Sequence, residues 1–207
     1  MKTKNILKLA MALLLVMMPS MMKAQGDLAA FDLKGKVKSC TWINHKAGCV
    51  QFGFMNDANK EVITFDATGK CKTWNGEAFA AGGRSGSAVH NEVTRDAKRR
   101  ITYGSLYNAF YNPGSADEHF KYNAAGKLAS HRYEDAGMTI TTTFTYDAAG
   151  VMTASTSKLE NLMDEKTTYK KVTYSVTAKD AKGNWTKRTA KLSTGKTWTE
   201  TRTILYY

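Results

Sequence analysis

A short turn motif recurs along the chain, and it constrains the fold more than any other feature of the sequence. Its clearest copy is Phe-Thr-Tyr-Asp-Ala-Ala-Gly-Val-Met at positions 144–152. Asp at the first position of a type I turn caps the turn's backbone amides, and Gly at the fourth position adopts the positive φ that ends the turn. In a β-hairpin, this turn plus a bulge pairs the residue before Asp with the residue two after Gly. The motif therefore predicts a hairpin in which Tyr146 pairs with Met152.

Related turns are distributed over most of the chain. Five copies end in glycine: Asp32–Gly35, Asp66–Gly69, Asn123–Gly126, Asp147–Gly150 and Asp180–Gly183. Two copies have another residue in place of this glycine: Asp57–Lys60 and Asp96–Arg99. The segment Leu192–Trp198 is a looser relative. A fixed spacing between copies would indicate a solenoid. The spacing here is irregular, so we expect hairpins joined by connections of unequal length, with Gly35, Gly69, Gly126, Gly150 and Gly183 as structural turn residues.

The residues next to these turns predict one apolar face of a sheet. The positions two after Gly, or their equivalents, are all apolar: Val37, Val62, Cys71, Ile101, Leu128, Met152 and Trp185. The same pairing rule places Phe120 opposite Ser130 and Phe144 opposite Ala154. Residues 138–146 alternate between Thr and larger side chains, which is typical of a half-buried strand.

We therefore expect an all-β fold, an antiparallel meander of repeated hairpins with roughly a dozen strands. A sheet of that size must curl into a barrel-like shape or form two packed layers, because long open sheets do not remain flat and unprotected.

Residues 1–24 have the features of an export signal. A basic start precedes an apolar run from Ile6 to Met18, which is too short for an ordinary membrane span, and Ala24 suits signal peptidase. We expect cleavage before Gln25, which leaves residues 25–207 as a single β domain in the periplasm, on the cell surface or outside the cell. An uncleaved membrane anchor is the alternative.

The whole chain has a formal net charge of +12, with basic residues spread along it rather than clustered. For an exported protein this favours a solvated basic surface, with an anionic glycan or lipopolysaccharide as the second interpretation. We expect no nucleic-acid partner, no membrane span in the mature chain, and either a glycan or another exported protein as partner.

Two segments resemble a known repeat family. Tyr-Asn-Ala-Ala-Gly-Lys-Leu at 122–128 and Tyr-Asp-Ala-Ala-Gly at 146–150 resemble YD repeats, the Tyr-Asp-x-x-Gly-Arg-Leu hairpins of Rhs-type proteins. The segments 182–186 and 202–207 are similar to small exported bacterial proteins of unknown function that carry such repeats. The resemblance implies a repetitive antiparallel sheet. Large YD-repeat shells wrap a cargo or bind carbohydrate, but this chain is too small for a shell and has no toxin domain.

The three cysteines suggest at most one disulfide. Cys40 and Cys49 flank a turn-like segment at 44–48, and export permits oxidation, so any disulfide should join these two. Cys71 occupies a core-facing position, where we expect a buried free thiol. No CxxC or HxxxH spacing occurs in the chain. The sequence therefore predicts no metal site and no cofactor.

The sequence shows no recognisable enzyme motif. It contains no GxSxG, no P-loop and no dinucleotide fingerprint, and no pair of carboxylates stands out as a glycosidase pair. Two segments, Asp-Glu-His at 117–119 and His-Arg-Tyr-Glu-Asp at 131–135, lie on strands that face each other across the turn at 123–126. Such strands would bring carboxylates and imidazoles together, which we interpret as surface salt bridging. We therefore expect a non-catalytic protein.

The tryptophans provide the candidate binding residues. Three tryptophans lie an odd number of residues after the glycine of the preceding turn: Trp42, Trp74 and Trp198. Because side chains alternate along a strand, residues at these positions are expected to point away from the core. Exposed indoles would form a stacking platform for sugars, and Phe110 and Tyr111, in a connection rich in aromatic residues, are further candidates. The alternative is that both faces of the sheet are covered and the indoles are buried.

These features favour an exported, non-catalytic binding module for glycans. The alternative is a structural protein whose sheet docks another exported protein. An outer-membrane barrel, suggested by Leu205 and the terminal Tyr207, is less consistent with the sequence. Membrane strands need one uniformly apolar face, whereas Lys187 and Arg188 place a charge on each face of the same strand.

Overall fold

The computed structural model describes residues 26–45, 60–74, 77–78, 89–107 and 115–207. A 3-10 helix, η2, spans Gly26–Phe31. The strands are β1 (Val37–Asn44), β2 (Lys60–Phe65), β3 (Cys71–Trp74), β4 (Glu77–Ala78), β5 (Val89–Arg95), β6 (Ile101–Tyr107), β7 (Ser115–Tyr122), β8 (Leu128–Glu134), β9 (Met138–Tyr146), β10 (Met152–Asn161), β11 (Lys166–Lys179), β12 (Trp185–Leu192) and β13 (Thr197–Tyr206). The predicted export signal, residues 1–24, lies outside the described residues.

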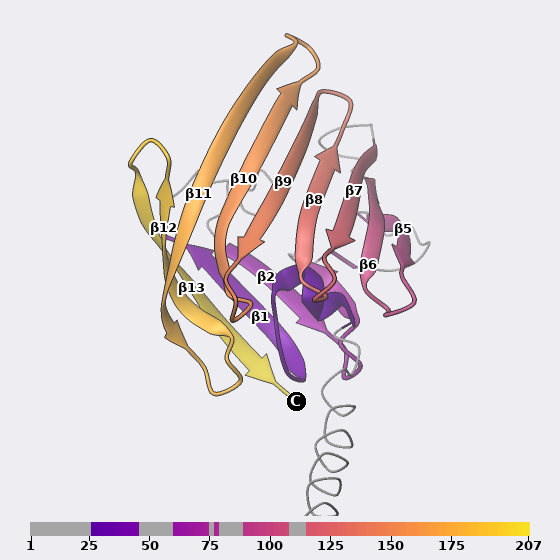
Figure 1. Cartoon of the computed structure of the whole chain (residues 1–207). Coiled ribbons are helices and arrows are strands. Elements are labelled where there is room, and N and C mark those ends of the chain that lie inside the picture. The colour runs from indigo at the N-terminus through magenta and orange to yellow at the C-terminus, as the bar shows by residue number, and fades with distance from the viewer. Residues whose placement is uncertain (1–25, 46–59, 75–76, 79–88, 108–114) are drawn as a thin grey trace, which may run out of the picture.

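The strands form one antiparallel sheet of thirteen strands in the order β4-β3-β2-β1-β13-β12-β11-β10-β9-β8-β7-β6-β5 (Figure 1). The predicted all-β meander is therefore confirmed. Because β1 pairs with β13, the first and last strands lie side by side inside the sheet rather than at its edges. The sheet edges are β4 and β5, which approach each other, but among the described residues no ladder joins them.

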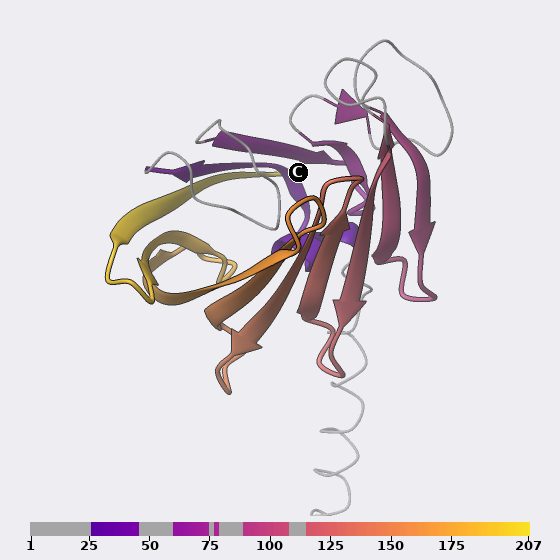
Figure 2. The same ribbon diagram turned by 90° about the horizontal axis from the view of Figure 1, so that it is seen from above.

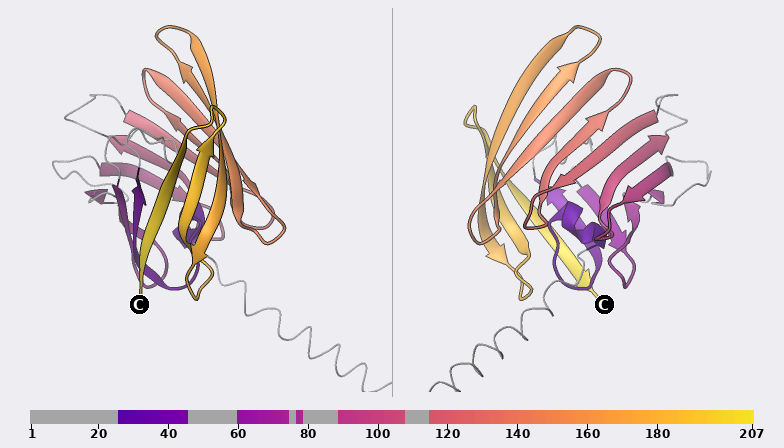
Figure 3. Two further views of the ribbon diagram at one scale, coloured as in Figure 1. Left: turned by 90° about the vertical axis from the view of Figure 1, so that its left-hand side faces the viewer. Right: turned by 45° about the vertical axis from the view of Figure 1, so that its right-hand side comes forward.

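The sheet curls around the short helix η2. Figure 2 shows the curl from above with η2 inside it, and Figure 3 shows η2 between the purple N-terminal strands and the orange later strands. The predicted curling of the sheet is confirmed, and the sheet remains open between β4 and β5. Of the described elements, no helix combines the length and the apolar character needed to cross a membrane.

The hairpin turns have the predicted local geometry. Tyr122 pairs with Leu128 and Tyr146 pairs with Met152, while Gly126 and Gly150 have φ values of 79° and 72°. In the turn at 147–150, the Asp147 carboxylate accepts a hydrogen bond from the backbone amide of Val151 at 2.8 Å. Each turn is therefore stabilised within its own residues, as expected for a capped type I turn.

A bulge after each of the turns at 123–126 and 147–150 shifts the register by one residue. Pairing jumps from Met152 to Ala154 on β10, so Phe144 pairs with Ser155. A similar jump on β8 pairs Phe120 with His131. The predicted pairs of Phe120 with Ser130 and of Phe144 with Ala154 are therefore wrong by one residue. An extra residue reverses which side chains face inward, because side chains alternate along a strand.

The tyrosine before each turn connects neighbouring hairpins. The Tyr122 hydroxyl donates to the backbone carbonyl of Ile101 at 2.8 Å, and the Tyr146 hydroxyl donates to that of Leu128 at 2.9 Å. In both cases the acceptor is the first residue of the strand that follows the preceding turn. Arg100 directly follows the turn at 96–99, and its guanidinium lies 4.1 Å from the Tyr122 ring centroid. The repeated motif therefore specifies contacts between hairpins as well as the turns themselves.

Replacing Gly150 with valine should lower the free energy of unfolding by about 1–2 kcal/mol, because a β-branched residue is strained at positive φ. Chemical denaturation of both proteins would measure the change. Ala149→Val, at the preceding exposed position of the same turn, is the matched control and should have a smaller effect. An unchanged midpoint for Gly150→Val would contradict the role of this glycine.

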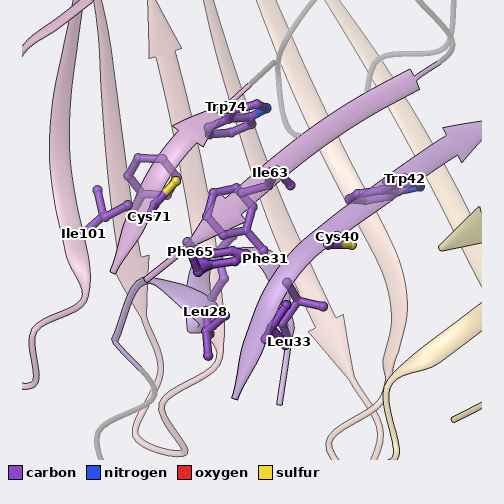
Figure 4. Close-up of a cluster of buried hydrophobic side chains, with 14 of the residues drawn as sticks. Leu28, Phe31, Leu33, Cys40, Trp42, Ile63, Phe65, Cys71, Trp74 and Ile101 are labelled. Atoms are coloured by element: carbon purple, nitrogen blue, oxygen red, sulfur yellow. The ribbon is translucent and has the colours of Figure 1, made fainter. Parts of the chain in front are cut away.

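The apolar core lies between η2 and the inner face of the sheet. Phe31 contacts the ring of Phe65 edge-on at 5.6 Å and that of Trp74 at 4.9 Å. Leu28 and Leu33 are also buried, and Figure 4 shows these side chains directed toward one another. The first turn copy, Asp32–Gly35, follows η2 rather than a strand, so its expected hairpin does not form. The N-terminal segment is used instead to fill the curl.

Asp27 holds η2 to both sides of the open edge. Its carboxylate is completely buried and accepts a hydrogen bond from the backbone amide of Cys71, on β3, at 2.8 Å. The same carboxylate accepts bonds from Arg95, at the end of β5, at 2.9 Å from Nε and 2.8 Å from Nη2. Since β4 and β5 share no ladder, this carboxylate provides a direct connection between the two ends of the sheet.

Candidate binding site inside the curled sheet

Six ionisable side chains are buried on the inner face of the sheet. We call them the interior polar cluster: Glu61, Glu118, His131, Arg188, Glu200 and Arg202. None is more than 5% exposed. Glutamate and arginine are rarely fully buried unless they are paired. The concentration of such groups in the interior singles out this region as the candidate functional site.

Arg188 and Glu200 form the best-paired part of the cluster. Arg188 approaches Glu200 Oε2 at 2.6 Å from Nη2 and 2.7 Å from Nε, and the Trp198 indole donates to Glu200 Oε1 at 2.9 Å. The guanidinium also lies 3.8 Å from the Tyr174 ring centroid and 4.1 Å from that of Trp185. These contacts compensate both charges, because charge-assisted hydrogen bonds and aromatic faces replace the lost hydration.

Arg202 joins the cluster to the N-terminal segment. Its Nη2 donates to the carbonyl of Phe31 at 2.9 Å, and its guanidinium lies 3.8 Å from the Trp185 ring centroid and 4.4 Å from that of Trp42. Its Nε has no hydrogen-bond partner within the described part of the chain. The guanidinium therefore keeps a donor for a further group.

Glu61 is the cluster member whose protonation is most strongly altered. Burial raises the pKa of its carboxyl to about 8; the positive charge of Arg202 opposes the rise, while Glu200 and Glu118 add to it. At neutral pH the carboxyl is therefore mostly protonated. Because the pKa of Glu61 responds to both Glu200 and Glu118, the two sides of the cluster are electrostatically connected.

Glu118 and His131 form a second buried pair. His131 Nε2 lies 3.9 Å from Glu118 Oε2, and both side chains are completely buried. Burial raises the pKa of Glu118, and the neighbouring His131 opposes the rise. Interpreting these residues as a surface pair was wrong, because the bulge on β8 turns His131 inward opposite Phe120. The turn motif itself marks this bulge, because it lies three residues after Gly126, as the bulges on β3 and β10 lie three residues after Gly69 and Gly150.

The predicted tryptophan platform is wrong. Trp42, Trp74 and Trp198 are only 2%, 6% and 9% exposed. The ladders of β1 and β3 contain register shifts after their turns, and these reverse the alternation that was expected to turn Trp42 and Trp74 outward. Trp198 faces inward opposite the buried Ala190. The other two candidates, Phe110 and Tyr111, lie outside the described residues.

The cysteine at 71 is buried and free, as predicted. Burial raises the pKa of its thiol, with a further contribution from Asp27, so the reactive thiolate is disfavoured. Cys40 is also buried and free. Its predicted disulfide partner, Cys49, lies outside the described residues.

The cluster offers both hydrogen-bond donors and acceptors but no metal site. In the described ranges, no three His, Cys, Asp or Glu residues are arranged to hold a metal ion. Glu61 Oε2 and Trp185 Nε1 have no hydrogen-bond partner there, and neither Glu118 oxygen makes a hydrogen bond. Such groups suit a polar ligand that accepts and donates hydrogen bonds.

No protein-family model and no curated protein sequence matches this chain.

Proposed function

We propose that this chain is an exported, non-catalytic binding protein that holds a small, hydroxyl-rich ligand such as a saccharide on the inner face of its sheet. The observation that carries the proposal is the unsatisfied hydrogen-bonding capacity of the interior polar cluster. Three atoms in this buried region, Glu61 Oε2, Trp185 Nε1 and Arg202 Nε, have no partner in the described part of the chain. Leaving a buried polar atom unpaired costs about 1–3 kcal/mol, which a bound ligand would recover.

The charge balance of the cluster argues against a cationic ligand. Arg188 is compensated by Glu200 at 2.6 Å, Glu61 is mostly protonated at neutral pH, and Arg202 donates to the carbonyl of Phe31 rather than to a carboxylate. A cationic ligand would add a further uncompensated positive charge to this interior at considerable cost, whereas a neutral or acidic saccharide would not. Sugar hydroxyls both donate and accept, so they match a carboxyl, an indole N–H and a guanidinium N–H within one site.

The hairpins also support a relation to YD repeats. In this proposal the tyrosine of the motif connects successive hairpins, as Tyr122 and Tyr146 do through their bonds to Ile101 and Leu128. That role gives a physical reason for a tyrosine before the turn. It concerns the scaffold alone, and the ligand is argued from the interior polar cluster.

A glycan array on the mature chain, residues 25–207, followed by calorimetric titration of the hits, tests the proposed function. Glu61→Leu should weaken binding by about tenfold or more, because it replaces a carboxyl that contacts the ligand with an apolar side chain of similar size. Glu134→Leu is the matched control on the half-exposed side of β8, where Glu134 pairs with Arg132, and it should bind normally. Equal affinity of the wild type and Glu61→Leu would contradict the proposed site.

A second candidate function, docking of another exported protein, is supported by the β10–β11 hairpin. Leu162, Met163 and Tyr169 are 52%, 82% and 69% exposed, and the hairpin extends beyond the other strands in Figure 1. Exposed apolar residues that are clustered are typical of interaction surfaces. A folded protein that binds no glycan would favour this second function.

A further inference from the structure

We propose that the open edge of the sheet carries a separate pocket for a sulfate or phosphate group, formed by Lys70, Arg95 and Arg99. These side chains line a cavity of about 50 Å³ together with Gly26 and Thr68. The space accommodates one small group rather than a sugar ring. The proposed ligand is therefore a tetrahedral oxyanion, either free or carried by a larger molecule.

The pocket forms where elements from both ends of the sheet meet. Lys70 directly follows the turn between β2 and β3, whereas Arg99 ends the turn between β5 and β6. Gly26 begins η2, the helix that connects the two sides through Asp27. Lys70 is thereby brought to the same cavity as Arg95 and Arg99, which lie on the other side of the open edge.

Arg99 lines the cavity from a turn position with positive φ, which it shares among non-glycine residues with Asp32 and Glu165 in the described chain. The same turn position is glycine in the copies at 69, 126, 150 and 183, with φ between 72° and 84°. Arg99 adopts φ 61° at this position, although a side chain is disfavoured there. Strained backbone that persists in a folded protein is concentrated at functional sites. Here the strained residue lines the cavity.

The charges around the pocket are unequally compensated. Arg95 is paired with Asp27 at 2.8 Å, which fixes its guanidinium, and the neighbouring Arg100 is paired with Asp96. Within the described chain, neither Lys70 nor Arg99 makes an ion pair. The pocket therefore has excess positive charge together with a guanidinium held in place, an arrangement that suits an oxyanion.

Arg99→Gly provides a test in which loss of binding is separable from loss of folding. Glycine accepts the positive φ, so the melting temperature should rise by about 2–4 °C. The affinity for the oxyanion should nevertheless fall at least about tenfold, because a charged donor is removed. Lys98→Ala is the matched control: it removes one positive charge from an adjacent exposed position that does not line the cavity, and its affinity should equal that of the wild type.

The titrations would follow backbone amide shifts at constant ionic strength, with inorganic sulfate, inorganic phosphate and a sulfated disaccharide as probes. Stronger binding of the sulfated disaccharide than of inorganic sulfate would show that a carbohydrate carries the anionic group. Equal binding of these two probes would identify the free anion as the ligand. Wild-type affinity in Arg99→Gly, an equal loss in Lys98→Ala, or no saturable shifts with any probe would each overturn the proposal. Glu61→Leu should bind the anion normally, which separates this pocket from the interior polar cluster.

Discussion

Replacing Asp27 with alanine should lower the free energy of unfolding by about 3–5 kcal/mol, the range for breaking a buried ion pair from one side. The substitution leaves Arg95 without its carboxylate and the backbone amide of Cys71 without its acceptor. It also removes the connection that η2 makes between β3 and β5. We expect this to be among the most destabilising single substitutions in the chain.

Urea denaturation of the mature protein measures this effect. Asp27→Asn should lose less stability than Asp27→Ala, because the amide oxygen still accepts a hydrogen bond although the charge is gone. Asp164→Ala, in the exposed turn between β10 and β11, is the control and should change the free energy of unfolding by about 0.5 kcal/mol or less. A loss below about 1 kcal/mol for Asp27→Ala would contradict the role of Asp27 at the open edge.

The protein should become less stable as the pH rises from 5 to 9, because of Glu61. Its pKa is about 8 in the folded protein, compared with 4.5 for an unperturbed glutamate. Between these values the folded state holds a proton that the unfolded state releases, so raising the pH favours unfolding. The loss saturates above pH 8. We expect a decrease of about 2–4 kcal/mol in the free energy of unfolding over this range.

Denaturation at a series of pH values would measure this dependence. Glu61→Gln mimics the protonated carboxyl and does not titrate, so its stability should change much less between pH 5 and 9. Glu118, whose pKa is also raised by burial, adds a dependence of the same sign that would remain in this variant. Glu134→Gln should keep the wild-type profile. Parallel profiles for the wild type and Glu61→Gln would show that Glu61 is not buried as described.

The turns could be predicted because their stabilising interactions are local. Asp147 caps an amide four residues away, and Gly150 supplies the positive φ within the same turn. The pairing of Tyr146 with Met152 follows from that geometry alone. Once several such hairpins lie in sequence, an antiparallel meander follows, and its size requires it to curl.

The residues of the candidate site could not be predicted in the same way. The expected strict alternation left out the bulge that lies three residues after the glycine of the turn, and one extra residue reverses which side chains face inward. This is why Trp42 and Trp74 were expected outside but lie inside, and why the inward position of His131 was missed. Which inward side chains meet in one cluster depends on how the sheet curls, and no turn motif specifies that.

The amino-acid sequence by itself determined the hairpin unit, because short-range turn chemistry specifies it, and the number of hairpins required the sheet to curl. The pairing of β1 with β13 was decided by the tertiary structure. The tertiary structure alone decided which residues fill the curl and which contacts connect β3 to β5 across the open edge. The burial of η2 rests on contacts such as that of Asp27 with Arg95, 68 positions away. The interior polar cluster likewise joins β2, β7, β8, β12 and β13. No local pattern encodes such contacts, since they exist only after the sheet has curled.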